Sequence, residues 1–290
     1  MPQTDRFFEL LEAHDGWVDL RAAKLRVNLE KMALKASAKT AIEIRNLASA
    51  QGLIVDGQIT QSPATQRILR RADSIFIEIL DGLGYREEIE GFAGVMAAPG
   101  SDLAIKDTQL KFFDDTFAEI NKRLKTPLEP PRWRKEDARL FSSKKLTSIK
   151  ALENEVGIIA TESASQTMVS FGAVGQRELT GILAEQFGSS WGRVEALSTT
   201  TLTAHYRTLH RQAYRLIEEQ QDVGPLKLVY AGPRDKLNRP FCRRTLANNK
   251  PRTEKQINRL NAKPSKLRPI MTAGGGFNCR HIWVIAGDDE

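Results

Sequence analysis

Apolar side chains recur at intervals of three and four residues in five stretches of the first 224 positions. This spacing places them on one face of an α-helix, and such a face normally packs into a protein core. The stripes are Leu25, Leu29, Met32 and Ala36; Ile68, Ala72, Ile75 and Ile79; Leu110, Phe113, Phe117, Ile120 and Leu124; Leu146, Ile149, Leu152, Val156 and Ile159; and Leu202, Tyr206, Leu209, Ala213 and Leu216. The pattern predicts a long helical body.

The distribution of proline supports this prediction. None of the 12 prolines lies between Pro131 and Pro225, whereas six lie in the last 66 residues. Because proline is excluded from helix interiors, the long proline-free stretch favours helix. Ser62-Pro63 is typical of a helix start, with a serine N-cap before a first-turn proline. A short β-hairpin around Asp-Gly is expected at residues 53–60.

The last 66 residues follow a different pattern. Residues 226–230 alternate like a strand, and residues 279–285 give a second strand. Between them we expect Arg-rich turns, a short helix near 254–261 and a flexible glycine turn at 274–276.

The fold class that follows is mainly α, a long helical body with a small basic α+β domain at the C-terminus. We predict one domain at 1–224 and a second at 225–290, with internal boundaries of the body near 97–100 and 126–131, where proline gathers.

The net charge of +7 belongs to the C-terminal domain. Residues 225–290 hold 14 Lys and Arg against 5 Asp and Glu, whereas residues 1–224 hold 29 against 31. Such a surface suits the phosphates of a nucleic acid, with strong salt dependence, or an acidic protein partner. The third interpretation is an ordinary solvated surface. The residues expected to contact phosphate or an acidic partner are Arg243, Arg244, Lys250, Arg252, Lys255 and Arg259.

Several classes of protein are disfavoured. No apolar run approaches the ~20 residues of a membrane span, and the N-terminus lacks the features of a secretory signal. The sequence contains no nucleophile elbow, no His-Glu-x-x-His and no Walker motif. We therefore expect a cytoplasmic chain that binds no membrane and is not an enzyme.

Both cysteines lie in the C-terminal domain, and His281 follows Cys279 by two residues. Alternate residues of a strand face the same side, so a Cys-Cys-His cluster would form if Cys242 lay alongside. Packed structural thiols without a cofactor are the main expectation. The alternatives are a Cys242–Cys279 disulfide and a zinc ion on Cys242, Cys279 and His281, with Asp235 or a water as its fourth ligand.

The C-terminal region resembles a known family. A basic, aromatic helix at 204–219 precedes the segment LVYAGPRDKLNRPFC at 228–242, and the chain closes with GFNCRHIW at 276–283. This order is similar to the C-terminal domain of phage minor head proteins of the Mu F type, the head morphogenesis family, although many members end in Cys-Arg-Cys rather than Cys-Arg-His. The matching anchors are Asp235, Arg239, Cys242, Asn278, Cys279, Arg280 and His281.

The resemblance implies a structural virion protein without catalytic residues. It would be a minor capsid or portal-vertex component, acting in head morphogenesis and in DNA packaging or delivery. Its partners would be the portal or other virion proteins and the packaged DNA, with several copies in one assembly, in the virion and, during assembly, in the host cytoplasm. The alternatives are a neck protein (a head–tail adaptor or connector) and a zinc-dependent nucleic-acid-binding module. We expect the anchors to hold the C-terminal domain together, with Asp235 paired to Arg239 or Arg280.

Overall fold

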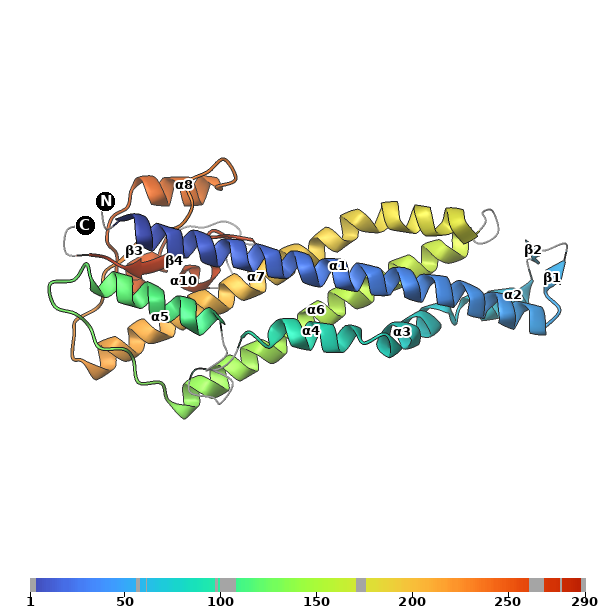
Figure 1. The fold of residues 1–290 in the computed structure, drawn as a ribbon, viewed down its shortest axis with the longest axis horizontal. Helices are drawn as coiled ribbons and strands as arrows, with labels where there is room; N and C mark the ends of the chain where they lie inside the picture. The colour runs from blue at the N-terminus through green and yellow to red at the C-terminus, as the bar shows by residue number, and fades with distance from the viewer. Residues whose placement is uncertain are drawn as a thin grey trace. The chain divides into compact units, whose positions relative to one another are not determined.

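The computed structural model describes the backbone of residues 4–55, 58–60, 62–96, 99, 108–170, 176–260, 269–276 and 278–287 (Figure 1). The fold is mainly α with a small α+β region at the C-terminus, which confirms the predicted class. The elements in chain order are α1 Thr4–Ala50, β1 Ile54–Val55, β2 Gln58–Ile59, α2 Pro63–Leu69, α3 Ala72–Gly82, α4 Tyr85–Ala93, α5 Thr108–Asn121, α6 Lys135–Ser170, α7 Gln176–Gln220, β3 Leu228–Ala231, α8 Pro240–Ala247, α9 Glu254–Ile257, α10 Ile270–Ala273 and β4 Ile282–Ile285.

The chain divides into two compact units, and helices α1, α6 and α7 contribute residues to both. The first unit consists of Ala22–Ala93 and Ile149–Glu195, and the second consists of Met1–Arg21, Gly94–Ser148 and Ala196–Glu290. Residues 225–290 therefore share a unit with the ends of the long helices. The units divide the chain differently from the boundary at residue 224 that the sequence suggests.

In the first unit, local sequence signals explain where the elements begin. Leu25 and Leu29 of α1 are buried, as their stripe predicts. The Ser62 hydroxyl accepts a hydrogen bond from the Thr65 backbone N–H at 3.1 Å, which confirms the N-cap before Pro63. Strands β1 and β2 pair antiparallel, which confirms the strand pairing of the short hairpin, while its Asp-Gly turn lies outside the described residues.

The apolar stripe predicted for α6 is wrong at its first residue, Leu146. Leu152 and Val156 of α6 are buried, but Leu146 is 59% exposed. Phe141, which is fully buried, lies eleven residues before Leu152. Eleven residues make about three helical turns, so the buried face of this part of α6 runs along Phe141 and leaves Leu146 outside it.

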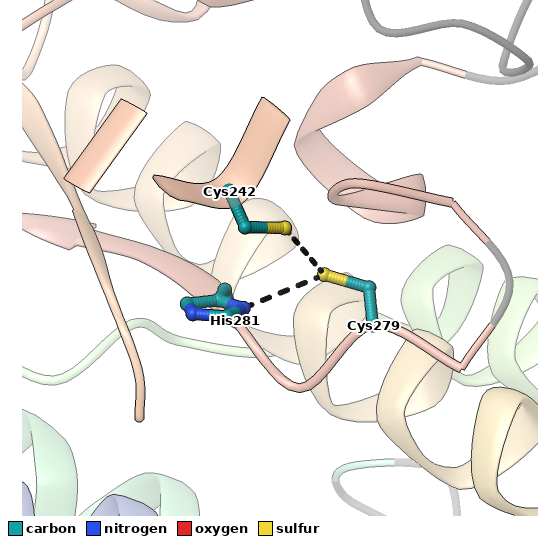
Figure 2. A group of neighbouring side chains, drawn as sticks. All are labelled: Cys242, Cys279 and His281. Carbon is teal, nitrogen blue, oxygen red and sulfur yellow. Dashed lines mark hydrogen bonds between the residues drawn. The ribbon is translucent and has the colours of Figure 1, made fainter. Parts of the chain in front are cut away.

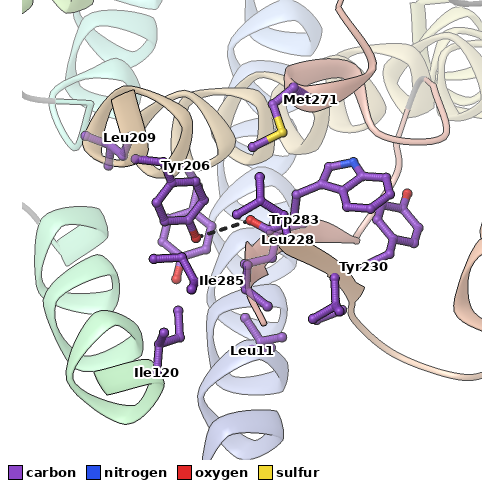
Figure 3. Close-up of a cluster of buried hydrophobic side chains, with 14 of the residues drawn as sticks. Leu11, Ile120, Tyr206, Leu209, Leu228, Tyr230, Met271, Trp283 and Ile285 are labelled. Carbon is purple, nitrogen blue, oxygen red and sulfur yellow. Dashed lines mark hydrogen bonds between the residues drawn. The ribbon is translucent and has the colours of Figure 1, made fainter. Parts of the chain in front are cut away.

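The second unit has an extensive apolar core, part of which Figure 3 shows in close-up. Leu11 of α1, Ile120 of α5 and Leu209 of α7 are buried in it beside residues of both C-terminal strands. This confirms the stripes predicted for α5 and for the second half of α7. The C-terminal strands therefore complete the core of the helices.

Strands β3 and β4 pair antiparallel, with Tyr230 opposite Trp283 and Leu228 opposite Ile285. All four residues of each strand are buried. Both strands read as continuous apolar runs, which is typical of strands covered on both faces. Helix α7 covers one side, where the Tyr214 hydroxyl donates a hydrogen bond to the Trp283 carbonyl at 3.2 Å.

Helix α8 stands where the sequence suggested only Arg-rich turns. Pro240 occupies its first turn and Arg239 is the N-cap. Phe241, Cys242 and Leu246 are buried on one face of this helix. The signal was present in the sequence, because a first-turn proline followed by apolar positions one helical turn apart is typical of a helix start.

Buried histidines alternate with aromatic rings along α7. The His14 ring of α1 stacks on Tyr206 with ring centroids 3.9 Å apart, and His210 meets Tyr206 edge-on at 4.6 Å. Burial lowers the pKa of His205 and of His210 to about 3. Both rings are therefore neutral packing groups at neutral pH.

We expect the folded state to lose stability as the pH falls below 6.5. His205 and His210 have folded pKa values of about 3 against 6.5 for the free side chain. Between these values only the unfolded chain takes up the protons, so the stability present above pH 6.5 declines by roughly 1.4 kcal/mol per pH unit for each histidine. Urea unfolding at pH 7 and pH 5 measures this loss.

The variant His205→Leu is the control for this prediction. It removes one titrating ring, and its free energy of unfolding should depend less steeply on pH between pH 7 and pH 5. A wild-type chain whose unfolding free energy is the same at both values would contradict the prediction.

Candidate functional site

Cys242, Cys279 and His281 come together at one end of the small sheet (Figure 2). Cys242 lies in the first turn of α8, and the other two residues lie just before β4. The two sulfurs are 3.8 Å apart, and the Cys279 sulfur is 3.7 Å from Nδ1 of His281. All three side chains are buried. The structure therefore brings together the Cys-Cys-His cluster that a metal site would need, with two free thiols and one imidazole.

Hydrogen bonding and stacking fix the orientation of His281. Its Nε2 lies 2.9 Å from the Pro233 carbonyl oxygen. Because a carbonyl only accepts hydrogen bonds, Nε2 carries the proton, and in the neutral ring Nδ1 presents its lone pair to Cys279. The ring stacks on Tyr230 with centroids 5.1 Å apart and an interplanar angle of 14°. The acceptor nitrogen of His281 is therefore held facing the thiols.

The Cys279 sulfur has the most favourable environment for negative charge. It accepts the Gly275 backbone N–H at 3.1 Å, and the Tyr230 hydroxyl lies 3.4 Å away. A hydrogen bond from Cys242 and the nearby Arg207 guanidinium lower the pKa of the Cys279 thiol. The same hydrogen bond, together with burial, raises the pKa of the Cys242 thiol. Of the two coupled thiols, Cys279 therefore has the lower pKa.

Glycines pack directly against all three side chains. A Cβ atom added to Gly275 would lie 2.5 Å from the Cys242 sulfur, and one added to Gly274 would lie 2.9 Å from the Cys279 sulfur. A Cβ on Gly232 would lie 2.7 Å from the His281 ring. Gly274 and Gly275 are buried, and the glycine turn expected from the sequence packs against the two sulfurs. A larger residue at either position would displace a sulfur.

Asp235 belongs to an ion pair beside the cluster. Its carboxylate is 2.5 Å from the Arg280 guanidinium and accepts the Leu237 backbone N–H at 2.9 Å. The hydrogen bond from Arg280 lowers the pKa of this carboxyl. Of the two pairings expected for Asp235, the one with Arg280 is present, while Arg239 donates to the Gly275 carbonyl at 3.2 Å.

Asn278 connects the segment before β4 to helix α7 through its backbone N–H. It has a positive φ of 54°, a conformation that asparagine tolerates better than most residues. Its N–H donates to the Thr200 hydroxyl of α7 at 2.8 Å. The anchor therefore ties the start of the last segment to the long helix.

Arg207 is the functional residue that the sequence did not reveal. It lies on α7 and is only 2% exposed. Its guanidinium donates to the carbonyl of His281 at 2.8 Å, to that of Thr272 at 3.3 Å and to that of Cys279. One arginine among several on a basic helix carries no sequence signal of such a role, because its partners are backbone oxygens far away in the chain.

The predicted basic contact residues are mostly free to meet a partner. Arg243, Arg244, Lys250, Lys255 and Arg259 are exposed. Arg252 is half-buried, and its backbone pairs with Leu228 at the edge of the sheet. These side chains lie on and around α8 and α9, outside the Cys/His cluster.

No protein-family model, curated protein or solved structure matches the chain. Among the described residues, no helix is long and apolar enough to cross a membrane. The cluster, its supporting residues and the basic surface are therefore the features of this chain that bear on its function.

We expect Gly275→Ala to destabilise the fold by about 2 kcal/mol, because the new methyl group would overlap the Cys242 sulfur. Urea unfolding measures the change, and faster reaction of the two thiols with Ellman's reagent reports the opening of the cluster.

Gly16→Ala is the matched control. Gly16 lies inside α1, and a Cβ there meets no atom within 4 Å. This change should stabilise the chain by about 1 kcal/mol through helix propensity and leave thiol reactivity unchanged. Equal effects of the two substitutions would contradict the packing assigned to Gly275.

Proposed function

We propose that the chain is a structural component of a phage virion, a minor capsid or portal-vertex protein that acts in head morphogenesis and in DNA packaging or delivery. The observation that carries this proposal is that the residues matching the family lie close together in the structure. They come from two segments that are distant in the sequence and make contact beside the small sheet: Asp235, Arg239 and Cys242 in the first, and Asn278, Cys279, Arg280 and His281 in the second.

The chemistry of these anchors supports a structural role. Cys242 and Cys279 are buried, and His281 is held by a backbone carbonyl and by a ring stack. Asp235 and Arg280 neutralise one another. The hydrogen bonds and charges of these side chains are paired within the fold, which suits a structural role. A catalytic site must instead leave a reactive group accessible to its substrate.

The exposed basic side chains support a role beside an acidic surface. Arg243 and Arg244 project from α8, which is held to the sheet by its buried face. The first unit and the long helices contribute no comparable excess of positive charge. The proposed partners are therefore the portal or another virion protein and the packaged DNA, and they meet residues 240–259.

We expect a tagged copy of the chain to copurify with intact, nuclease-treated phage particles, at a few copies per particle. Electron microscopy with a gold-labelled tag should place it at the portal vertex. The double variant Arg243→Glu/Arg244→Glu should fold normally and be incorporated poorly, because charge reversal opposes docking on an acidic surface.

The matched control is Lys35→Glu/Lys39→Glu, which reverses two exposed charges of α1. It should be incorporated like the wild type. A chain absent from purified particles would contradict the proposal, and a ring of label below the portal, outside the head, would favour the neck or adaptor role instead.

A further inference from the structure

We propose that Cys242, Cys279 and His281 bind a structural zinc ion. Tetrahedral zinc holds sulfur at about 2.3 Å and nitrogen at about 2.0 Å, which places two sulfur ligands about 3.8 Å apart and a sulfur and a nitrogen about 3.5 Å apart. The two thiols are 3.8 Å apart, and the Cys279 sulfur is 3.7 Å from His281 Nδ1. Two of the three ligand pairs therefore already have the separation that the ion requires.

The third pair needs only a small adjustment. The ligand atoms of the cluster all lie within 4.8 Å of one another, so the sulfur of Cys242 and the ring of His281 must approach by about 1 Å at most. Cys242 has one side-chain torsion and lies in the first turn of α8, so a rotation of its sulfur supplies this movement. The His281 ring can stay in place.

The surroundings of the ligands are those of a metal site. A zinc-bound histidine normally donates its other ring N–H to a carbonyl or carboxylate, which fixes the tautomer. His281 does so through Nε2 and the Pro233 carbonyl, leaving Nδ1 directed at the thiols. The Gly275 N–H donates to the Cys279 sulfur, as outer groups commonly do to a bound thiolate.

The fourth side of the ion faces Tyr230. Its hydroxyl lies 3.4 Å from the Cys279 sulfur and 3.6 Å from the Cys242 sulfur, and it closes this side directly or through a water. Asp235, suggested from the sequence as a fourth ligand, is engaged by Arg280 and the Leu237 N–H. Among the described residues, the cluster gathers no further Cys, His, Asp or Glu.

The types of ligand favour zinc, and the burial of the site favours a structural role for the ion. Thiolates together with imidazole suit zinc better than magnesium or calcium, which prefer oxygen. The site is buried and joins α8 to the segment before β4, 37 residues later in the chain. An ion there would cross-link the two ends of the C-terminal module and add its binding free energy to folding.

The test is the zinc content of the full-length chain, purified in a reducing buffer without chelator and measured by plasma mass spectrometry. We expect one zinc ion per chain. Replacement by cobalt(II) should give a thiolate-to-cobalt charge-transfer band and the strong visible bands of a tetrahedral site. These spectra do not depend on any variant remaining folded.

The variants Cys279→Ser and His281→Gln should lose the zinc and the charge-transfer band, whereas His205→Leu should keep both. The chain has only two cysteines, so a thiolate signal has no other source. A wild-type chain without zinc that also gives no cobalt charge-transfer band overturns the proposal. A Cys242–Cys279 disulfide in the chain as purified overturns it equally. Neither result depends on whether the chain is a virion protein.

Discussion

The guanidinium of Arg207 fills a buried position where α7, α10 and the segment before β4 meet. It donates to the carbonyl of Thr272 in α10 and to those of Cys279 and His281 in the segment before β4. A buried carbonyl without a donor costs about 1–3 kcal/mol, so this segment requires the arginine. The arginine in turn requires the three oxygens, because they replace the water that burial removes.

The Cys/His cluster depends on the same contact. Arg207 holds the backbone of Cys279 and of His281, and thus sets the direction of both side chains. From this position Cys279 reaches Cys242 and His281 stacks on Tyr230. The glycines at 274 and 275 allow this close approach. The geometry proposed for zinc is therefore a consequence of how the last segment docks on α7.

The sequence predicted the parts of this structure that local patterns determine. Stripes such as Leu202 to Leu216 mark helices because burial needs one apolar face, and Ser62-Pro63 marks a helix start because its cap is local. The sequence also indicated both strands of the small sheet, the first from its alternating pattern at 226–230. The two-residue spacing suggested that Cys279 and His281 share one side of a strand, but β4 begins at Ile282 and both residues lie just before it. The resemblance pointed to Cys242 as a member of the same module.

What the sequence did not predict depends on contacts between distant segments. Arg207 resembles every other arginine of its helix until its partners are known. Gly274 and Gly275 suggested a flexible turn, although their role is to leave room for sulfur atoms contributed from elsewhere. Leu146 fits a helical stripe, but which face is buried depends on the elements that cover Phe141 and Leu152. A long-range fit of this kind leaves no periodic signal in a single sequence.

Hydrogen exchange of the Arg207→Met variant tests the account most directly, with Arg215→Met, an exposed arginine of the same helix, as the control. The account predicts that Arg207→Met removes the exchange protection of the amides at 279–285 while the amides of α5 stay protected, and that Arg215→Met changes neither. Full protection of 279–285 in Arg207→Met would show that the last segment is held in place without the arginine, and would contradict the account.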